Sequence, residues 1–380
     1  MIYLDHAATT RPCPEALAAM ADAQERCWGN PSAIYGPGRQ AKALLESARR
    51  TVAGALNASP GEILFTSGGT ESDVQALFTA ARWGAAQGRR HLVSTRIEHH
   101  AVLRTLSALQ ERGFSVTLLG VDEKGRVDPA DAAAALTPDT CLLSVMTANN
   151  EVGTIQPVAE LGALCRQRKV LFHTDAVQAA GHLPLDVQAQ NIDLLSLSAH
   201  KFHGPRGAGA LYVRRGVEAA NVLFGGGQER GHRPGTENLP AIAGMAAALR
   251  RAVETMSRDA ARTGALRDRL ATALLAIPGA ALNGDPERRL PGHLNVSFAG
   301  LSAETLLLLL DERGICASAG AACSAGALEP SHVLLAMGQP PARARSALRL
   351  TLDASNTEEE VDTAAAVIAG LVETLRKNHF

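Results

Sequence analysis

The feature that most constrains the fold is an alternation between short apolar runs and segments with helical periodicity. The runs are rich in β-branched residues and are closed by small or polar residues. Such an alternation is typical of a doubly wound α/β protein with a mostly parallel sheet. We expect seven strands, at Ile63–Phe65, His91–Val93, Val116–Leu119, Leu142–Val145, Val170–Phe172, Leu194–Leu197 and Ala210–Val213.

The alternation gives way to a long helical stretch from about Asn238 to Ala276. A second set of elements follows, which includes a strand at His293–Phe298. We expect a large domain at residues 13–255 and a smaller α/β domain built from residues 1–12 and 256–380.

The charge balance argues against partners that bind through electrostatic attraction. Lys and Arg number 37, Asp and Glu number 38, and the net charge is -1. We therefore expect neither direct nucleic-acid binding nor membrane binding. The amino-terminal residues hold no basic leader followed by an apolar stretch, and the run Leu306–Leu310 is too short to span a bilayer. These features predict a cytoplasmic protein.

The six cysteines form no CxxC pair, and in a reducing compartment we expect free thiols. Cys141 and Cys165 fall inside a predicted strand and helix, where a buried, inert thiol is expected. Cys323 differs, because it lies within a run of small residues, 317–326, that can neither pack a core nor form a stiff strand. A mobile loop is the physical expectation there.

A lysine and an acid follow consecutive strands of the predicted sheet. Lys201, at a partly buried strand end next to a Gly-Pro turn, is a candidate for a depressed pKa and for Schiff-base chemistry. Alone it is a weak signal, since most lysines are solvated. Asp175 ends the preceding strand, and a pyridoxal ring needs both an amine for its aldehyde and a carboxylate opposite its pyridinium nitrogen.

Two further strand ends carry weaker signals. The turn at 66–71 would point free N–H groups at an anion, although a simple helix cap explains it equally well. It lacks the lysine of a P-loop, which argues against a nucleoside triphosphate. His99 and His100 lack the further ligands of a metal site, so a ring stacked on a planar cofactor is the better interpretation of His99, and we expect no resident metal.

Long motifs that follow one another in order along the chain carry a family resemblance. The chain resembles the pyridoxal-phosphate cysteine desulfurases of the NifS/IscS type, and the match spans essentially its whole length. The motifs are YLDHAATT, GNPSAIYG, ILFTSGGTES, EHHAV, NNEVGTIQPV, HTDAVQAAG, SLSAHKFHGPRGAGALYVRRG, GGGQERGHRPGTEN and ASAGAACSAGALEPSHVL.

The resemblance implies the fold type I of pyridoxal 5'-phosphate enzymes and a set of cofactor contacts. Lys201 would hold the cofactor covalently, Asp175 would pair with the pyridinium nitrogen, and Gln178 would bind the phenolic oxygen. His99 would stack on the ring and move protons. The phosphate would be held by Gly69, Thr70, Ser198, His200 and Thr236, the last from a second subunit, which implies a homodimer.

The resemblance also implies the reaction. Asn150 and Arg349 would bind the substrate L-cysteine, and Cys323, on a catalytic loop at about 317–330, would take its sulfur as a persulfide while L-alanine leaves. The sulfur would pass to an acceptor protein, either an iron–sulfur scaffold or a tRNA-thiolation enzyme. The family also allows Cys323 to act as a transient ligand of an iron–sulfur cluster.

Two alternatives stay open at this point. One is a selenocysteine lyase, or another small-substrate lyase of the same fold, which would not need an essential enzyme thiol. The other is a non-catalytic sulfur-binding or scaffold protein that kept the fold. The joint presence of Lys201, Asp175, His99 and Cys323 argues against the second.

Overall fold

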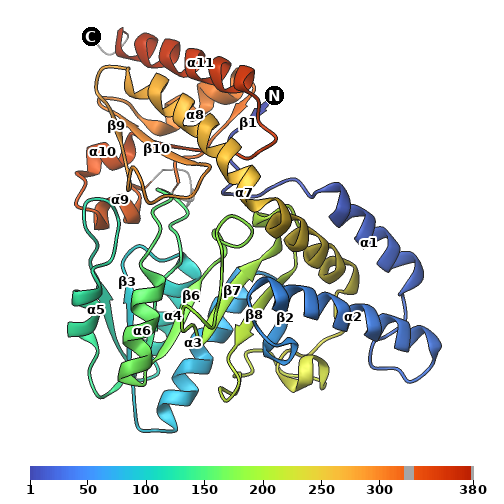
Figure 1. Cartoon of the computed structure of the whole chain (residues 1–380). Helices are drawn as coiled ribbons and strands as arrows, with labels where there is room; N and C mark the ends of the chain where they lie inside the picture. Colours follow the sequence, from blue (N-terminus) through green and yellow to red (C-terminus); the bar gives the residue numbers. More distant parts are fainter. Residues whose placement is uncertain (321–328, 378–380) are drawn as a thin grey trace.

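A computed structural model describes residues 1–320 and 329–377 of the chain. Figure 1 shows a larger lobe built around a central sheet and a smaller lobe that lies above it in this view. Helix α7 (Leu239–Leu275) runs from one lobe into the other. The predicted domain boundary at residue 255 falls inside this helix, and the division into two domains stays a prediction.

The larger lobe contains the predicted mostly parallel sheet of seven strands. The strand order is β2-β8-β7-β6-β5-β3-β4, and only β8 is antiparallel to its neighbours. Each predicted run forms a strand, so the predicted fold class is confirmed. The strands are β2 (Ile63–Thr66), β3 (His91–Thr95), β4 (Ser115–Leu119), β5 (Thr140–Ser144), β6 (Leu171–Asp175), β7 (Leu194–Ser198) and β8 (Gly209–Val213).

Helices cover both faces of this sheet. Apolar residues at spacings of three and four, such as Leu45, Ala48 and Val52, give α2 a stripe that packs on one face together with α1, α6 and part of α7. The other face packs against α3 and α4. The helices of this lobe before α7 are α1 (Pro14–Arg26), α2 (Gly36–Ala55), α3 (Gly69–Ala85), α4 (His100–Gln110), α5 (Pro129–Ala135) and α6 (Val158–Arg168).

The smaller lobe has its own apolar core around a three-stranded antiparallel sheet. The central strand β10 pairs with β9 and β12, and a two-stranded parallel pair joins β1 to β11. Its strands are β1 (Ile2–Tyr3), β9 (Ala280–Leu282), β10 (His293–Phe298), β11 (Ile315–Cys316) and β12 (Ala347–Thr351), and its helices are α8 (Ala303–Glu312), α9 (His332–Ala336), α10 (Pro341–Arg345) and α11 (Glu358–Lys377).

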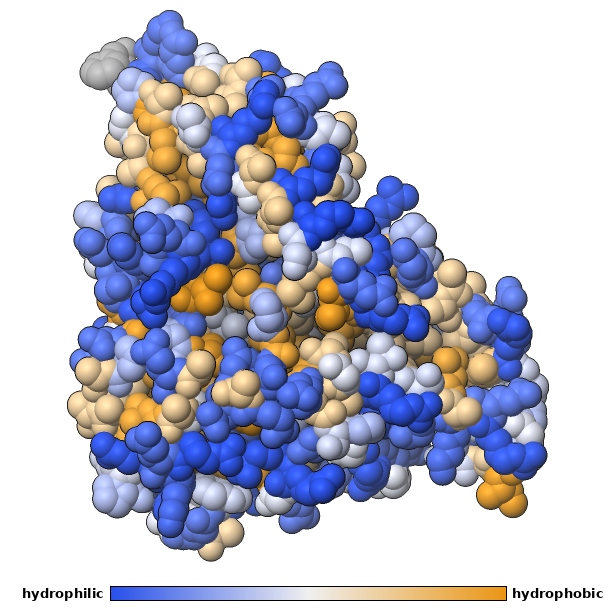
Figure 2. Space-filling view, viewed as in Figure 1, coloured by the Kyte–Doolittle hydropathy of each residue, from blue (hydrophilic) through white to orange (hydrophobic). Residues whose placement is uncertain are grey.

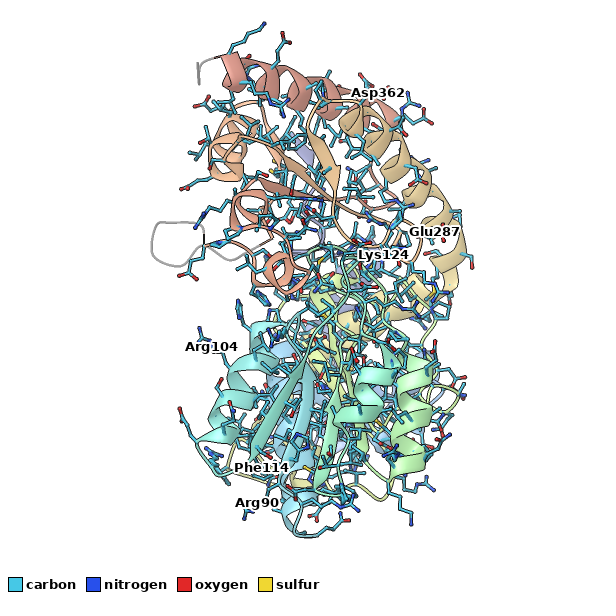
Figure 3. The ribbon with its side chains drawn as sticks, turned by 90° about the vertical axis from the view of Figure 1, so that its left-hand side faces the viewer. Arg90, Arg104, Phe114, Lys124, Glu287 and Asp362 are labelled. Atoms are coloured by element: carbon cyan, nitrogen blue, oxygen red, sulfur yellow. The ribbon has the colours of Figure 1, made fainter. Side chains whose placement is uncertain are left out.

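The carboxyl ends of the parallel strands face the smaller lobe. Figure 3 places Phe114, just before β4, at the far end of the larger lobe, whereas Lys124, shortly after β4, lies where the two lobes meet. Ligands of parallel α/β sheets bind beyond the carboxyl ends of the strands. The junction between the lobes is therefore where the fold places a site.

No helix among residues 1–320 and 329–377 is long and apolar enough to cross a membrane. Cys141 and Cys165 are buried in β5 and α6 as predicted, and burial raises the pKa of the Cys141 thiol to about 12. Both cysteines are therefore packed, unreactive thiols.

Candidate functional site

Lys201 ends a short 3-10 helix, η2 (Ala199–Lys201), that follows β7 directly. Its Nζ donates hydrogen bonds to the carbonyl oxygens of Ala7 (2.5 Å) and Ala8 (2.9 Å), so the amine points toward the amino-terminal segment. Burial lowers the pKa of Lys201 to about 8, and the nearby positive charge of Arg349 acts in the same direction. About a tenth of this amine is therefore unprotonated and nucleophilic at pH 7, far more than for an ordinary lysine.

Asp175 ends β6, the strand next to β7, and its carboxylate is buried. One oxygen accepts a hydrogen bond from the N–H of Val177 (2.9 Å), and the other accepts none from the described residues. Burial raises the pKa of Asp175, while His99 and Lys201 favour its ionised form. Nearby, Gln178 donates to the same Ala7 carbonyl (3.0 Å) that Lys201 contacts.

His99 lies at the N-cap of α4, at the carboxyl end of β3. Its Nδ1 accepts a hydrogen bond from the N–H of Ala101 (3.1 Å), so the neutral ring carries its proton on Nε2. Desolvation by the surrounding protein lowers the pKa of His99, and the charge of Asp175 opposes this shift. The side chain is itself exposed in the single chain, as suits a ring that would cover a ligand.

Three of the predicted phosphate ligands, Gly69, Thr70 and Ser198, lie at the start of α3. Gly69 and Thr70 are its first residues, and the first N–H groups of a helix have no partner within the helix. A side chain at Gly69 would approach Val177 to 2.7 Å and Ser198 to 3.5 Å, so only glycine fits there. His200 binds Thr9 through Nδ1 (3.2 Å), and burial lowers its pKa to about 4.

Arg349 reaches the site from β12 of the smaller lobe and is buried. Its Nη2 donates to Asp5 (2.8 Å) and its Nη1 donates to the carbonyl oxygen of Asn150 (3.0 Å). Its Nε is buried and has no hydrogen-bond partner among the described residues. Two of the five N–H donors of the guanidinium group are thus engaged, and the group keeps donors for a further acceptor such as a carboxylate.

This donor set fits pyridoxal 5'-phosphate. A buried carboxylate with one uncommitted oxygen, a lysine with a lowered pKa and a helix start lined by small residues are the groups that its pyridinium nitrogen, aldehyde and phosphate require. They all lie on the edge of the sheet that faces the smaller lobe.

Comparison with known proteins decides the family. The model of the family described as "Aminotransferase class-V" matches residues 2–363. The chain belongs to the class V aminotransferase family. The chain is 47% identical over 379 residues to cysteine desulfurase IscS of Clostridium botulinum (strain Hall), covering 99% of this chain and 95% of the relative. Enzymes of this family depend on pyridoxal phosphate, so the predicted cofactor is confirmed.

Solved structures agree. A NifS-like protein superposes with a TM-score of 0.92 at 40% identity, covering 98% of this chain and 99% of that one. SspA, described in complex with cysteine, superposes with a TM-score of 0.82 at 34% identity, covering 94% of this chain and all (100%) of that one. The predicted family resemblance is thereby confirmed.

No hydrogen bond among the described residues joins Thr236, one of the predicted phosphate ligands, to the assembled group. Thr236 is exposed and follows the short helix η3 (Gln228–Gly231). Cys323, with most of the predicted catalytic loop, lies outside the described residues. The nearest cysteine along the chain that is described is Cys316, a free thiol at the end of β11.

Several site residues were not predicted. Asp5 holds Arg349, and the Ala7 and Ala8 carbonyls hold Lys201, yet the amino-terminal motif received no role. Glu98, the residue before His99, is fully buried, and burial raises its pKa to about 8. The only sequence signal for these contacts is the position of Asp5 and Ala7 inside a recognisable motif.

A cavity of about 760 Å³ lies on the other side of the amino-terminal segment. Gln178 and His203 line it, but Lys201, Asp175 and Arg349 do not. The cavity therefore borders the predicted cofactor ligand Gln178 but is not lined by the Lys201, Asp175 or Arg349 side chains.

Proposed function

We propose that this chain is a pyridoxal-phosphate-dependent cysteine desulfurase, which removes sulfur from L-cysteine, releases L-alanine and holds the sulfur as a persulfide on Cys323. One observation carries the proposal. Lys201 and Asp175, at adjacent strand ends, face Arg349 from the smaller lobe in a chain that is 47% identical over 99% of its length to cysteine desulfurase IscS.

The cofactor, when bound, supplies an electron sink that weakens the bonds to the α-carbon of an amino acid. Lys201 would hold it covalently, Asp175 would keep its ring nitrogen protonated, and Gln178 would bind its phenolic oxygen. The start of α3 would hold its phosphate, together with Ser198 and His200.

Proton transfer would fall to Lys201 and His99. The lowered pKa of Lys201 lets its amine act as a base near neutral pH. His99 presents a proton on Nε2, because its Nδ1 is engaged by the helix start. The ring of His99 would also stack on the cofactor.

Substrate binding would fall to Arg349 and Asn150. The Arg349 guanidinium group, oriented by Asp5 and by the Asn150 carbonyl, would bind the carboxylate of cysteine. The structure of SspA in complex with cysteine, a relative of this chain, supports cysteine as the substrate.

Sulfur transfer would fall to Cys323. Its thiolate would attack the sulfur of bound cysteine, so that an S–S bond forms as the C–S bond breaks. The electron pair of the broken bond would stay on the carbon skeleton, which takes up a proton and leaves as alanine. The persulfide sulfur would then pass to an acceptor protein, with no nucleic acid bound directly.

A homodimer would complete the site, with Thr236 of a second copy reaching the phosphate. Large apolar side chains on the larger lobe support this proposal, because Trp28 (71% exposed), Ile34 (88%) and Phe224 (89%) would otherwise face water. Figure 2 shows apolar side chains at the tip of this lobe where α1 connects to α2. Sedimentation analysis should give a dimer, and Trp28→Glu with Phe224→Glu should weaken it.

The decisive test replaces the sulfur carrier. Cys323→Ala should keep the visible absorption of the bound cofactor but produce no alanine from cysteine. Cys316→Ala is the matched control, since it removes the described cysteine that is nearest to Cys323 along the chain, and should turn over normally. Normal alanine production by Cys323→Ala would refute the proposed role and favour a lyase that needs no enzyme thiol.

A further inference from the structure

A buried carboxyl group connects the two sides of the segment that carries Cys323. Glu151 follows Asn150 and is 2% exposed. Its side chain accepts a hydrogen bond from the hydroxyl of Ser331, which is 1% exposed and precedes α9. Ser331 comes after the segment 321–328, so this bond fixes the chain where it leaves the segment.

The same carboxyl group lies against the chain where it enters the segment. A Cβ atom added to Gly320 would stand 2.8 Å from Glu151 Oε2, so the Gly320 backbone packs closely against the carboxyl group. Gly320 also has a φ of 84°, which favours glycine. Glu151 therefore contacts both flanks of the segment.

These flanks are attached to residues of the proposed site. Ser318 exchanges backbone hydrogen bonds with Arg349 (3.1 and 2.6 Å). His332 binds the carbonyl oxygen of Glu98 (3.0 Å), next to His99, and its ring packs 4.8 Å from that of His100. The flanks thus start and end beside the groups proposed to bind the substrate and the cofactor.

We propose that Glu151 is a positioning residue for sulfur transfer: its carboxyl group, hydrogen-bonded to Ser331 and packed against Gly320, fixes the two points of the chain between which Cys323 lies in the sequence. This inference rests on the proposed role of Cys323. Displacement of a reacting atom by about 1 Å costs on the order of 100-fold in rate, so loss of this anchor acts on kcat rather than on cysteine binding.

The charge on Glu151 is not required for this role. Burial raises its pKa, although the Ser331 hydrogen bond, His332 and Arg349 favour the ionised form. A glutamine has nearly the same shape and can still accept the Ser331 hydroxyl. Glu151→Gln therefore tests whether the bond suffices.

The experiment compares Glu151→Ala and Glu151→Gln in the holoenzyme, with Glu62→Ala as the matched control. Glu62 is also a buried acid, accepts backbone N–H bonds from Ser59 and Arg215 (both 2.8 Å) and lies on the larger lobe, with no contact to Gly320 or Ser331. For Glu151→Ala we expect kcat for alanine production to fall about tenfold or more, with KM for cysteine changed less than about threefold. Glu151→Gln should restore most of kcat.

A second readout follows the thiol directly. The rate of iodoacetamide alkylation of Cys323, measured by peptide mass spectrometry without cysteine, should change at least about threefold in Glu151→Ala. Alkylation of Cys316 and the absorption of the bound cofactor should stay unchanged. If Glu151→Ala fails to fold, Ser331→Ala removes the same hydrogen bond from the other side. It should lower kcat and change the rate of Cys323 alkylation in the same directions as expected for Glu151→Ala.

Two results would overturn the inference: unchanged kcat together with unchanged Cys323 alkylation, or an equal loss in Glu62→Ala. Failure of the proposed function is seen separately, because Cys323→Ala would then still produce alanine whatever Glu151 does.

Discussion

The two sides of the candidate site are built in different ways. On the larger lobe, Asp175, Ser198 and Lys201 sit at or just after the ends of adjacent strands, so the sheet itself sets their spacing. On the smaller lobe, Arg349 is held by Asp5, 344 residues away in sequence. The first side carries groups suited to the cofactor, and the second carries groups suited to the substrate. The sheet thus sets the spacing of the cofactor groups, although the Lys201 amine also binds the distant Ala7 and Ala8 carbonyl oxygens, and the placement of Arg349 depends on a long-range contact.

The largest effect is expected from Lys201→Ala, which removes the amine on the larger lobe that is proposed to hold the cofactor. Loss of the amine should remove the visible absorption of the covalently held cofactor and lower alanine production at least about 1000-fold. Lys42→Ala, at an exposed lysine on α2, is the control and should behave as the wild type. An unchanged spectrum would remove Lys201 from this role.

The smaller-lobe side should respond differently. Arg349→Lys keeps the charge but loses the branched donor geometry, so KM for cysteine should rise about 10- to 100-fold while the cofactor absorption stays. Steady-state kinetics would measure the change in KM, and the visible spectrum would show whether the cofactor absorption stays. A loss of cofactor absorption with unchanged KM would contradict the division between the two sides.

The positive charge of Arg349, on the smaller lobe, lowers the pKa of Lys201, on the larger lobe, so this interaction can be tested through its pH dependence. Because the pKa of Lys201 is lowered to about 8, the unprotonated amine should increase about tenfold per pH unit below that value and level off above it. The rate at which apo-protein takes up pyridoxal phosphate should follow this curve.

Arg349→Gln is the control for this pH dependence. It removes a positive charge that lowers the pKa of Lys201, so the midpoint should move to higher pH. A midpoint near the ordinary lysine pKa in the wild-type protein would show that burial does not act on this amine.

The smallest expected effect is far from the site. Thr357 accepts a hydrogen bond from the N–H of Glu360 (3.1 Å), and the Glu360 carboxylate accepts one from the N–H of Thr357 (3.2 Å), which together begin α11. Thr357→Ala should lower the free energy of unfolding by about 1 kcal/mol in urea. KM for cysteine should not change; if it does, the smaller lobe transmits strain to Arg349.

The sheet side could be predicted from the sequence because it follows from local patterns. Short apolar runs mark the strands, and the residues after them, Asp175 and Lys201, must lie at the same edge of a parallel sheet. The predicted seven strands and family are accordingly confirmed. The roles of the site residues stay predictions.

The contacts of the amino-terminal segment could not be predicted in this way. Nothing in the pattern around Ala7 and Ala8 indicates that their carbonyl oxygens bind Lys201, because backbone acceptors carry no residue signature. The contact of Glu151 with Gly320 likewise depends on how two lobes pack. Such contacts are set by tertiary structure, and residue type alone does not reveal them.

The pairing of the amino-terminal segment has a consequence for biosynthesis. The N–H of Ala7 binds the hydroxyl of Thr351, 344 residues further along the chain, and β1 pairs with β11. During translation, residues 2–8 therefore leave the ribosome long before their partners exist. The lysine pocket that they close is finished only when nearly the whole chain has been made, so stable cofactor capture should be a post-translational event.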